Sequence, residues 1–192
     1  MRLILVRHFR TQSNEAQRIM GWGDAPPAKN WEEDLRAVDQ CLEQQHLVID
    51  AIFSSDLGRA RETARYFARR RGLAGVESHL AFNEVNYGDL FGLDKDSAST
   101  AYPQFKTDPD YVFPGGESFR QMQARCCAQV LELANRHPER TLLLVAHAGV
   151  IRALVCHFLG LDLVDHLRRK VSHRYIGDFQ FQDDNCLCYD EL

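Results

Sequence analysis

The sequence predicts an α/β fold, in which a mainly parallel sheet lies between two layers of helices as a three-layer α/β/α sandwich. Three short apolar runs lack polar alternation, as strands covered by helices on both faces do; they are residues 3–6, 51–53 and 142–146. Stretches with helical periodicity lie between and after these runs. The chain has 192 residues, 45% of them hydrophobic. That length can bury a sizeable core without metals or disulfides, so we expect a single domain over residues 1–192.

Two apolar stripes at helical spacing predict the helices that cover this sheet. The first stripe consists of Trp31, Leu35, Val38 and Leu42, and the second of Phe119, Met122, Cys126, Val130 and Leu133. Each stripe is preceded by a pattern typical of a capped helix start, in which a short polar side chain is followed three residues later by Glu or Gln. The predicted capping pairs are Asn30 with Glu33 and Ser118 with Gln121.

Two other segments complete the expected architecture. Residues 175–182 alternate between apolar and polar side chains, which predicts a half-buried strand lying antiparallel at the edge of the sheet. Residues 83–117 are rich in glycine, proline and aromatic residues, and their polar content argues against a core of their own. We expect this second segment to be a lid-like insertion.

Composition excludes several classes of function. A net charge of -4 and a pI near 6.1 give no long-range attraction for nucleic acid or for an anionic membrane. The apolar runs are too short to cross a bilayer, and the chain shows no secretory signal, so we expect a cytoplasmic protein with no membrane partner. The six cysteines lack the spacing of a zinc ribbon, and reduced thiols are expected.

Polar side chains follow each of the three predicted strands. Arg7 and His8 come directly after the first, Arg59 follows the second within a short polar segment, and His147 follows the third. Because the carboxyl ends of parallel strands meet at one edge of the sheet, these two arginines and two histidines should converge. Residues 9–14 also open a predicted helix, where free N–H groups and the helix dipole favour an anion. The sequence therefore predicts a phosphate site at this edge.

These residue types suit phosphoryl transfer. The guanidinium forks of Arg7 and Arg59 can stabilise the negative charge that spreads over the phosphoryl oxygens. A neutral imidazole can attack phosphorus and hold the group as phosphohistidine, and His8, beside Arg7, is the expected nucleophile. A carboxyl group must protonate the leaving alkoxide. Glu84 is the candidate, although on this reasoning Asp56 or Asp89 would serve nearly as well.

The chain resembles the histidine phosphatase superfamily, the phosphoglycerate-mutase-like group. The resemblance rests on five blocks in the family's order, which cover the chain from residue 1 to about residue 155. They are Arg7-His8, residues 54–64 (SSDLGRARETA), Asn83-Glu84 with Gly88 and Gly92, residues 114–118 (PGGES), and residues 147–152 (HAGVIR). The modest length and short insertion are more similar to alpha-ribazole phosphatase and broad-specificity phosphatases than to the longer phosphoglycerate mutases.

The resemblance implies a phosphate pocket and a reaction. The pocket would be formed by Arg7, His8, Arg59 and His147, with Asn14 and the backbone N–H of Ala148 contributing. Glu84 is singled out as general acid and base. No metal and no organic cofactor are implied. The expected activity is hydrolysis of a small phosphorylated metabolite through a phosphohistidine at His8.

One departure from the family pattern keeps alternatives open. The family usually has glycine after the nucleophile, where this chain has Phe9, which would be strained if the backbone needed a left-handed conformation. A phosphate-binding module with weakened catalysis is therefore one alternative. Phosphoryl transfer of the phosphoglycerate-mutase type is another. The residues that select the substrate are expected in segments 18–30 and 83–117, whose spacing identifies neither a substrate nor an oligomeric state.

Overall fold

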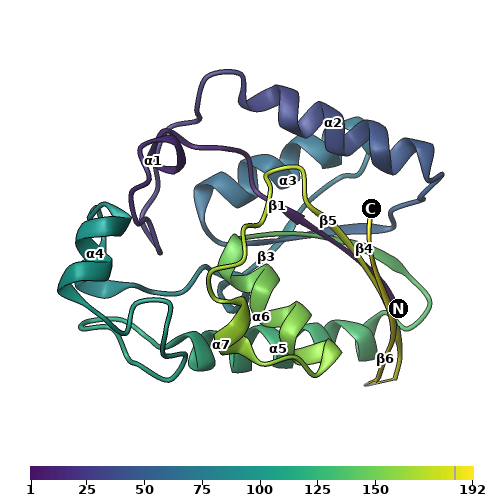
Figure 1. Ribbon diagram of the computed structural model, residues 1–192. Helices are drawn as coiled ribbons and strands as arrows, with labels where there is room; N and C mark the ends of the chain where they lie inside the picture. The colour runs from purple at the N-terminus through teal and green to yellow at the C-terminus, as the bar shows by residue number, and fades with distance from the viewer. Residues whose placement is uncertain (184) are drawn as a thin grey trace.

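The computed structural model describes residues 1–183 and 185–192, and its centre is a six-stranded sheet in the order β3-β2-β4-β1-β5-β6 (Figure 1). Strands β1 to β4 run parallel to one another, whereas β5 runs antiparallel to β1 and β6 antiparallel to β5. The strands are β1 (Arg2–Arg7), β2 (Ala51–Ser55), β3 (Glu77–His79), β4 (Thr141–Ala146), β5 (Ile176–Gln182) and β6 (Asn185–Glu191).

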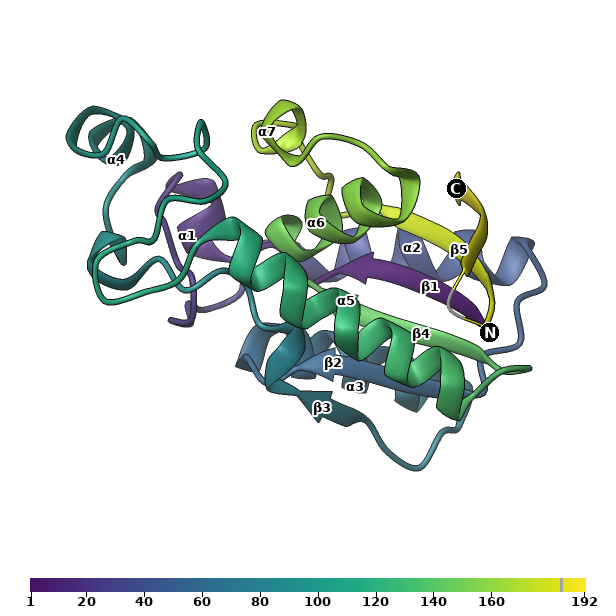
Figure 2. The ribbon, with the colours of Figure 1, turned by 90° about the horizontal axis from the view of Figure 1, so that it is seen from below.

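Helices cover both faces of the sheet, which confirms the predicted α/β/α layers. Helices α2 (Trp31–Gln44) and α3 (Gly58–Arg71) lie on one face, and α5 (Phe119–Arg136) and α6 (Ala148–Leu159) lie on the other (Figures 1 and 2). The strands lack polar alternation because each face contributes to a separate apolar core. In β1, Leu3 and Leu5 pack on the α5 and α6 side, and Ile4 and Val6 pack on the α2 and α3 side.

The short elements gather beyond the carboxyl ends of the parallel strands. Figure 1 shows α1 (Gln12–Glu15) and α4 (Lys95–Ala101) at that end of the sheet. The remaining short helices are η1 (Leu80–Phe82), η2 (Gly88–Leu90) and α7 (Leu163–His166). The segment 83–117 carries η2 and α4. Its aromatic side chains pack against Phe119 of α5 and so join the core of that helix instead of forming their own.

The strand predicted at residues 175–182 forms as β5, but it departs from the prediction in two ways. It is antiparallel to β1, as expected, but β6 pairs with its outer side, so β5 is not the edge of the sheet. Its first four residues are all buried, because the polar side chain among them, Asp178, accepts hydrogen bonds from Arg2 Nε at 3.0 Å and NH2 at 2.6 Å. A paired carboxylate can be buried without disturbing the core.

Of the two predicted capping pairs, one is confirmed and one is wrong. Ser118 and Gln121 form a reciprocal capping box at the start of α5. Asn30 precedes α2 in a left-handed conformation, with φ 58°, and its side chain makes no capping hydrogen bond. Asparagine is among the residues that adopt this conformation at low cost, so the same residue type serves here as a turn residue.

In the part of the chain that the structure describes, no helix is long and apolar enough to cross a membrane. The same described residues include all six cysteines, and none forms a disulfide. Cys126, Cys127 and Cys156 lie in the apolar core, Cys41 and Cys186 pack against it, and Cys188 is exposed.

Candidate active site

A cavity of about 800 Å³ lies beyond the carboxyl ends of β1, β2 and β4. Most of the site residues predicted from sequence line it, namely Arg7, His8, Asn14, Arg59, Glu84 and Ala148. His147 is fully buried and does not line the cavity, but its ring lies against that of His8, with the centroids 5.0 Å apart. The structure therefore brings together all the predicted residues.

His8 is held as a neutral imidazole with a defined tautomer. Its Nδ1 donates to the carbonyl oxygen of Phe9, with the two atoms 2.5 Å apart, which leaves Nε2 without a proton. Burial, with the charges of Arg59 and neighbouring groups, holds the pKa of His8 well below its usual range. The backbone N–H of His8 also donates to the carbonyl oxygen of Ala146 at 3.0 Å and extends the β1–β4 pairing to the nucleophile. A fixed, unprotonated Nε2 is what attack on phosphorus requires.

His147 is oriented by a serine beneath it. Ser55 Oγ lies 2.6 Å from His147 Nε2 and accepts a hydrogen bond from the N–H of Leu57 at 3.3 Å. A hydroxyl can accept from Leu57 and donate to Nε2 at the same time, and in that arrangement Nδ1 carries the imidazole proton. Nδ1 is buried and has no partner among the described residues. Burial and the charge of Arg59 hold the pKa of His147 well below its usual range, so the imidazole is neutral.

The two arginines are each held by backbone carbonyl groups. Arg7 donates from NH1 to Val171 O, and Arg59 donates to Gly21 O at 2.7 Å and Gly23 O at 2.5 Å. In both side chains Nε is buried without a partner among the described residues. Burial lowers the pKa of Arg7 to about 10, so this guanidinium is still charged at neutral pH.

A loop within segment 18–30, where residues that select the substrate were expected, also fixes Arg59. Asp24 accepts from Arg59 NH1 at 3.1 Å and, with its other oxygen, from the N–H of Gly58 at the start of α3 at 2.9 Å. With Gly21 and Gly23, this loop therefore orients one of the two site arginines. Its sequence carries no local signal for that role, because two of the three groups that hold the guanidinium are backbone carbonyl oxygens.

The carboxylate of Glu84 is seated on two backbone N–H groups. Oε1 accepts from its neighbour Val85 at 3.0 Å, and Oε2 accepts from Gly149 at 3.1 Å, in the first turn of α6. A Cβ at residue 149 would overlap Oε1 of Glu84, so any larger residue there would move the carboxylate from this position. The carboxylate thus reaches the site from the 83–117 segment and docks beside the histidines.

The backbone of Glu84 is held by two residues that sequence reasoning missed. Its carbonyl oxygen accepts from Trp22 Nε1 at 2.6 Å and from Arg125 NH2 at 3.1 Å. Arg125 itself pairs with Glu117 at 2.6 Å. The residue types could not indicate this role, because the partners come from a loop, from α5 and from the segment before it.

Asn14 and Thr11 serve first as a helix start. Thr11 is buried and forms a capping box with Asn14, whose Oδ1 accepts from the backbone N–H and the hydroxyl of Thr11 at 3.1 Å each. Because Oδ1 is used in this way, the amide of Asn14 can present only its NH2 group to the cavity that it lines. Ala148 is the first residue of α6 and lines the same cavity.

Phe9 does not obstruct the cavity. Its ring packs in the apolar core under α2, with its centroid 4.8 Å from that of Trp31, and it is not among the residues that line the cavity. Its φ is not positive, and its N–H donates to Thr63 Oγ1 at 3.0 Å. The strain considered from the sequence is therefore absent.

His173, which no sequence motif marks, lies against the nucleophile. Its Nδ1 donates to the carbonyl oxygen of His8 at 2.9 Å, and it lines the cavity. Burial, with the charge of Arg7, lowers its pKa to about 4.

The described residues contain no group of three or more His, Cys, Asp or Glu side chains placed to hold a metal ion.

Comparison with known families decides the classification. The model of the histidine phosphatase superfamily (branch 1) matches residues 3–189. The chain belongs to the histidine phosphatase superfamily. The superfamily blocks recognised in the sequence are the segments that carry His8, Arg59, Glu84 and His147 to the cavity.

Similar proteins within this superfamily include both mutases and phosphatases. A 2,3-bisphosphoglycerate-dependent phosphoglycerate mutase from Brucella melitensis biotype 2 is 31% identical over 179 residues, covering 88% of this chain and 87% of the mutase. A mycobacterial glucosyl-3-phosphoglycerate phosphatase, solved with VO3, matches with a TM-score of 0.84 and 26% identity over 99% of this chain and 96% of that one. An Escherichia coli K-12 protein, a putative alpha-ribazole-5'-P phosphatase, has a TM-score of 0.86 at 23% identity, covering 100% and 95%, and shows the fold alone.

Proposed function

We propose that this protein is a metal-independent phosphomonoesterase that hydrolyses a small phosphorylated metabolite through a phosphohistidine at His8. One observation carries the proposal. Three buried nitrogen atoms that have no partner among the described residues, Nε of Arg7, Nε of Arg59 and Nδ1 of His147, belong to the side chains grouped around the neutral His8. Buried N–H groups are costly to leave unpaired, and the oxygens of a phosphoryl group would pair them.

In the first half of the reaction, Nε2 of His8 attacks phosphorus as the bond to the ester oxygen breaks. The phosphoryl group passes to His8, and Glu84 donates a proton to the departing alkoxide, which leaves as the alcohol. Arg7, Arg59 and His147 stabilise the charge on the three phosphoryl oxygens. Because Nδ1 of His8 already donates to the backbone, the ring needs no rotation to present its lone pair.

In the second half, water replaces the alcohol. Glu84, now a carboxylate, takes a proton from the water as its oxygen attacks phosphorus, and the bond from phosphorus to Nε2 of His8 breaks. Inorganic phosphate leaves, and His8 and Glu84 return to their starting states. The two backbone N–H groups that hold Glu84 keep the same carboxyl group in place for both proton transfers.

Hydrolysis of 4-nitrophenyl phosphate in excess chelator tests the proposal. We expect turnover by the wild-type protein, loss of at least about a thousandfold in His8→Ala, and no loss in His157→Ala, an exposed histidine near the end of α6. Rapid quenching of the wild type with labelled substrate should trap a phosphoenzyme that is labile in acid and stable in base. Turnover that survives in His8→Ala, or wild-type turnover that appears only when a divalent metal ion is added, would contradict the proposal.

Mutase activity is the second candidate, because the Brucella relative that covers most of this chain is a phosphoglycerate mutase. A mutase must keep the phosphoryl group on histidine and return it to the substrate before water enters. Product analysis with phosphoglycerates separates the two activities. Exchange between the 2- and 3-isomers without release of phosphate would favour the mutase.

The argument for a phosphate-binding module with weakened catalysis no longer applies. It depended on Phe9 blocking in-line attack, and the ring of Phe9 packs against Trp31 instead of facing the cavity.

A further inference from the structure

The wall of the cavity carries far more positive charge than one phosphate requires. Nine Arg and Lys side chains line it, against two carboxylates, Glu15 and Glu84, although the whole protein has a net charge of -4. Arg7 and Arg59 suffice for the phosphoryl group, together with the histidines. The excess therefore belongs to a different part of the ligand.

Five of the seven remaining cations come from three separate segments of the chain. Lys95 and Lys106 belong to the 83–117 segment, Arg152 to α6, and Arg168 and Lys170 to the loop between α7 and β5. Arg152 lies four residues after Ala148 on the same helix, on the same face and about 6 Å further along the axis. This spacing places the backbone of Arg152 one helical turn beyond Ala148, and its side chain lines the same cavity.

Neighbouring acids do not neutralise this group. Among the described residues, none of Lys95, Lys106 and Arg152 has a carboxylate within ion-pair distance. Arg152 donates Nε to the carbonyl oxygen of Arg169 at 2.6 Å, which anchors the side chain without neutralising it. Burial, reinforced by the charges of Arg152 and Lys95, lowers the pKa of Lys106 to about 8. Each of these cations therefore makes it less favourable for the others to be charged.

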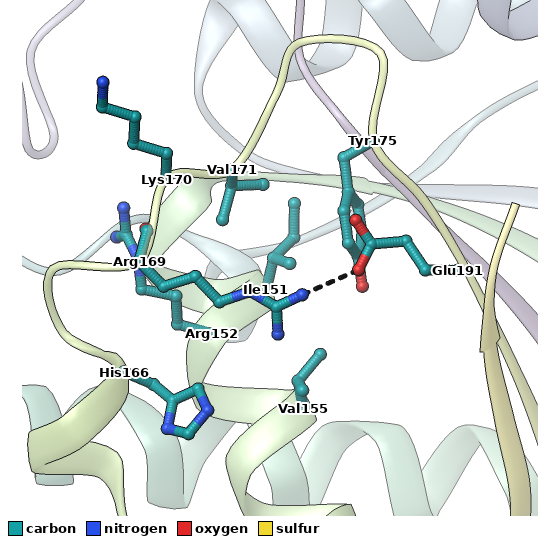
Figure 3. A pocket seen from close by; sticks show the side chains of 9 residues that line it. All are labelled: Ile151, Arg152, Val155, His166, Arg169, Lys170, Val171, Tyr175 and Glu191. Carbon is teal, nitrogen blue, oxygen red and sulfur yellow. Dashed lines mark hydrogen bonds and ion pairs between the residues drawn. The ribbon is translucent and has the colours of Figure 1, made fainter.

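The adjacent Arg169 provides a contrast within the same loop. Arg169 is paired with Glu191 at 2.9 Å, and Figure 3 shows that pair together with Lys170, whose side chain points away from it. A cation that serves the fold is thus matched with an acid here. Among the described residues, the cavity-lining cations of the 83–117 segment, of α6 and of the loop between α7 and β5 are not, which is the arrangement expected of an anion-binding surface.

We infer that Lys106 and Arg152, supported by Lys95 and Lys170, form a second anion subsite beside the phosphate pocket. The inference rests on the proposed function and narrows its substrate to a small organic phosphomonoester with a second anionic group, a carboxylate or another phosphate. Phe105 and Tyr87 line the cavity as well, and their rings supply an apolar surface for the carbon atoms between the two charges.

A matched pair of esters isolates the second charge. The first is 3-(phosphonooxy)propanoate and the second is its primary amide, which has the same shape and nearly the same leaving group but lacks the carboxylate. We expect kcat/KM for the acid to exceed that for the amide by roughly tenfold or more, as for one charge-assisted contact. A parallel pair, propane-1,3-diol bisphosphate and its monophosphate, shows whether the second anion is better supplied as phosphate.

Charge-removing variants assign that preference to residues. Lys106→Met and Arg152→Met should each lower the acid-to-amide ratio about five- to tenfold, and the double variant should bring it close to one. Arg69→Met, which removes an equal charge from the exposed end of α3, should leave the ratio unchanged. A wild-type ratio near one in both pairs of esters would overturn the inference, and so would a preference that neither cavity variant reduces.

Calorimetry separates failure of this inference from failure of the proposed function. If the wild type hydrolyses no aryl phosphate, the proposed function fails, and binding of the acid and the amide to the wild type and to Lys106→Met still tests the subsite. Tighter binding of the acid that Lys106→Met abolishes would support the subsite. Equal binding of the two ligands would overturn it.

Discussion

The floor and the rim of the cavity are built in opposite ways. The floor, formed by Arg7, His8, Arg59 and His147, stands at the ends of buried strands or at the start of a helix that follows one. Each of its side chains is fixed by at least one bond to a backbone group or to a buried side chain. The rim, formed by segments 87–108 and 167–173, collects cations of which, among the described residues, only Arg169 has an acidic partner. We conclude that the chemistry depends on local placement, whereas the choice of substrate depends on summed charge.

The largest expected effect tests whether the floor needs Glu84. Glu84→Gln retains the shape and one acceptor but can neither donate nor remove the proton, so kcat for an alkyl phosphate should fall by roughly 10² to 10⁴. With 4-nitrophenyl phosphate, whose leaving group needs little protonation, the loss in phosphoenzyme formation should be much smaller. Burst kinetics on both esters measure this difference. An equal loss on both would mean that Glu84 acts on binding and not as the acid.

A smaller effect is expected at the residue on which Glu84 is seated. In Gly149→Ala the new methyl group would displace the carboxylate, because it would overlap Oε1 and disturb the hydrogen bond to Oε2. We expect kcat to fall by about ten- to a hundredfold, since misplacing a reacting group by about 1 Å is costly. Ala153→Gly in the same helix is the matched control for backbone change. Full activity in Gly149→Ala would show that the carboxylate has another productive position.

The next prediction concerns pH and His173, where floor and rim meet. The pKa of His173 is about 4 in the folded protein and near 6.5 for an exposed histidine, so the unfolded chain binds more protons between these values. The free energy of unfolding should therefore decrease as the pH is lowered through this range, and His173 should account for about 2 kcal/mol of the decrease between pH 7 and pH 5. Turnover in His173→Gln should fall only a fewfold, because glutamine can still donate to the carbonyl oxygen of His8.

Urea unfolding at several pH values measures that slope. His173→Gln should lose the corresponding part of it, whereas His157→Gln, at an exposed position, should keep the wild-type slope. An unchanged slope in His173→Gln would mean that His8 and His147, whose pKa values are also lowered, account for all of it.

The smallest effect on turnover is expected at Phe9. Phe9→Leu should leave kcat and KM within about twofold, because this side chain faces the core and not the cavity. It should lower the free energy of unfolding by about 1–2 kcal/mol through lost packing against Trp31. A large gain in kcat would revive the view that Phe9 restricts the site.

The same contrast explains what the sequence could predict. The strands before His8 and His147 are apolar runs that end at a polar residue, so both their layer and the placement of these side chains follow from short-range patterns. The seven-residue strand β6 was missed because its mostly exposed side chains carry no apolar alternation. Asp24 acts through its contact with Arg59, which is distant in sequence, and Lys106 acts by its position in the cavity wall. Neither role could be predicted, because no local sequence pattern indicates contacts between distant segments.

The hydrogen bond from the amide of His8 to Ala146 has a consequence for how activity is lost on heating. It joins the nucleophile to the pairing of β1 with β4, two strands at the centre of the sheet. Exchange of this amide proton with solvent therefore requires the sheet itself to open, as for the slowest-exchanging amides of a domain. Local opening of segment 87–108 alone would leave that bond intact. Partly melted molecules would keep a competent nucleophile and lose discrimination between esters first.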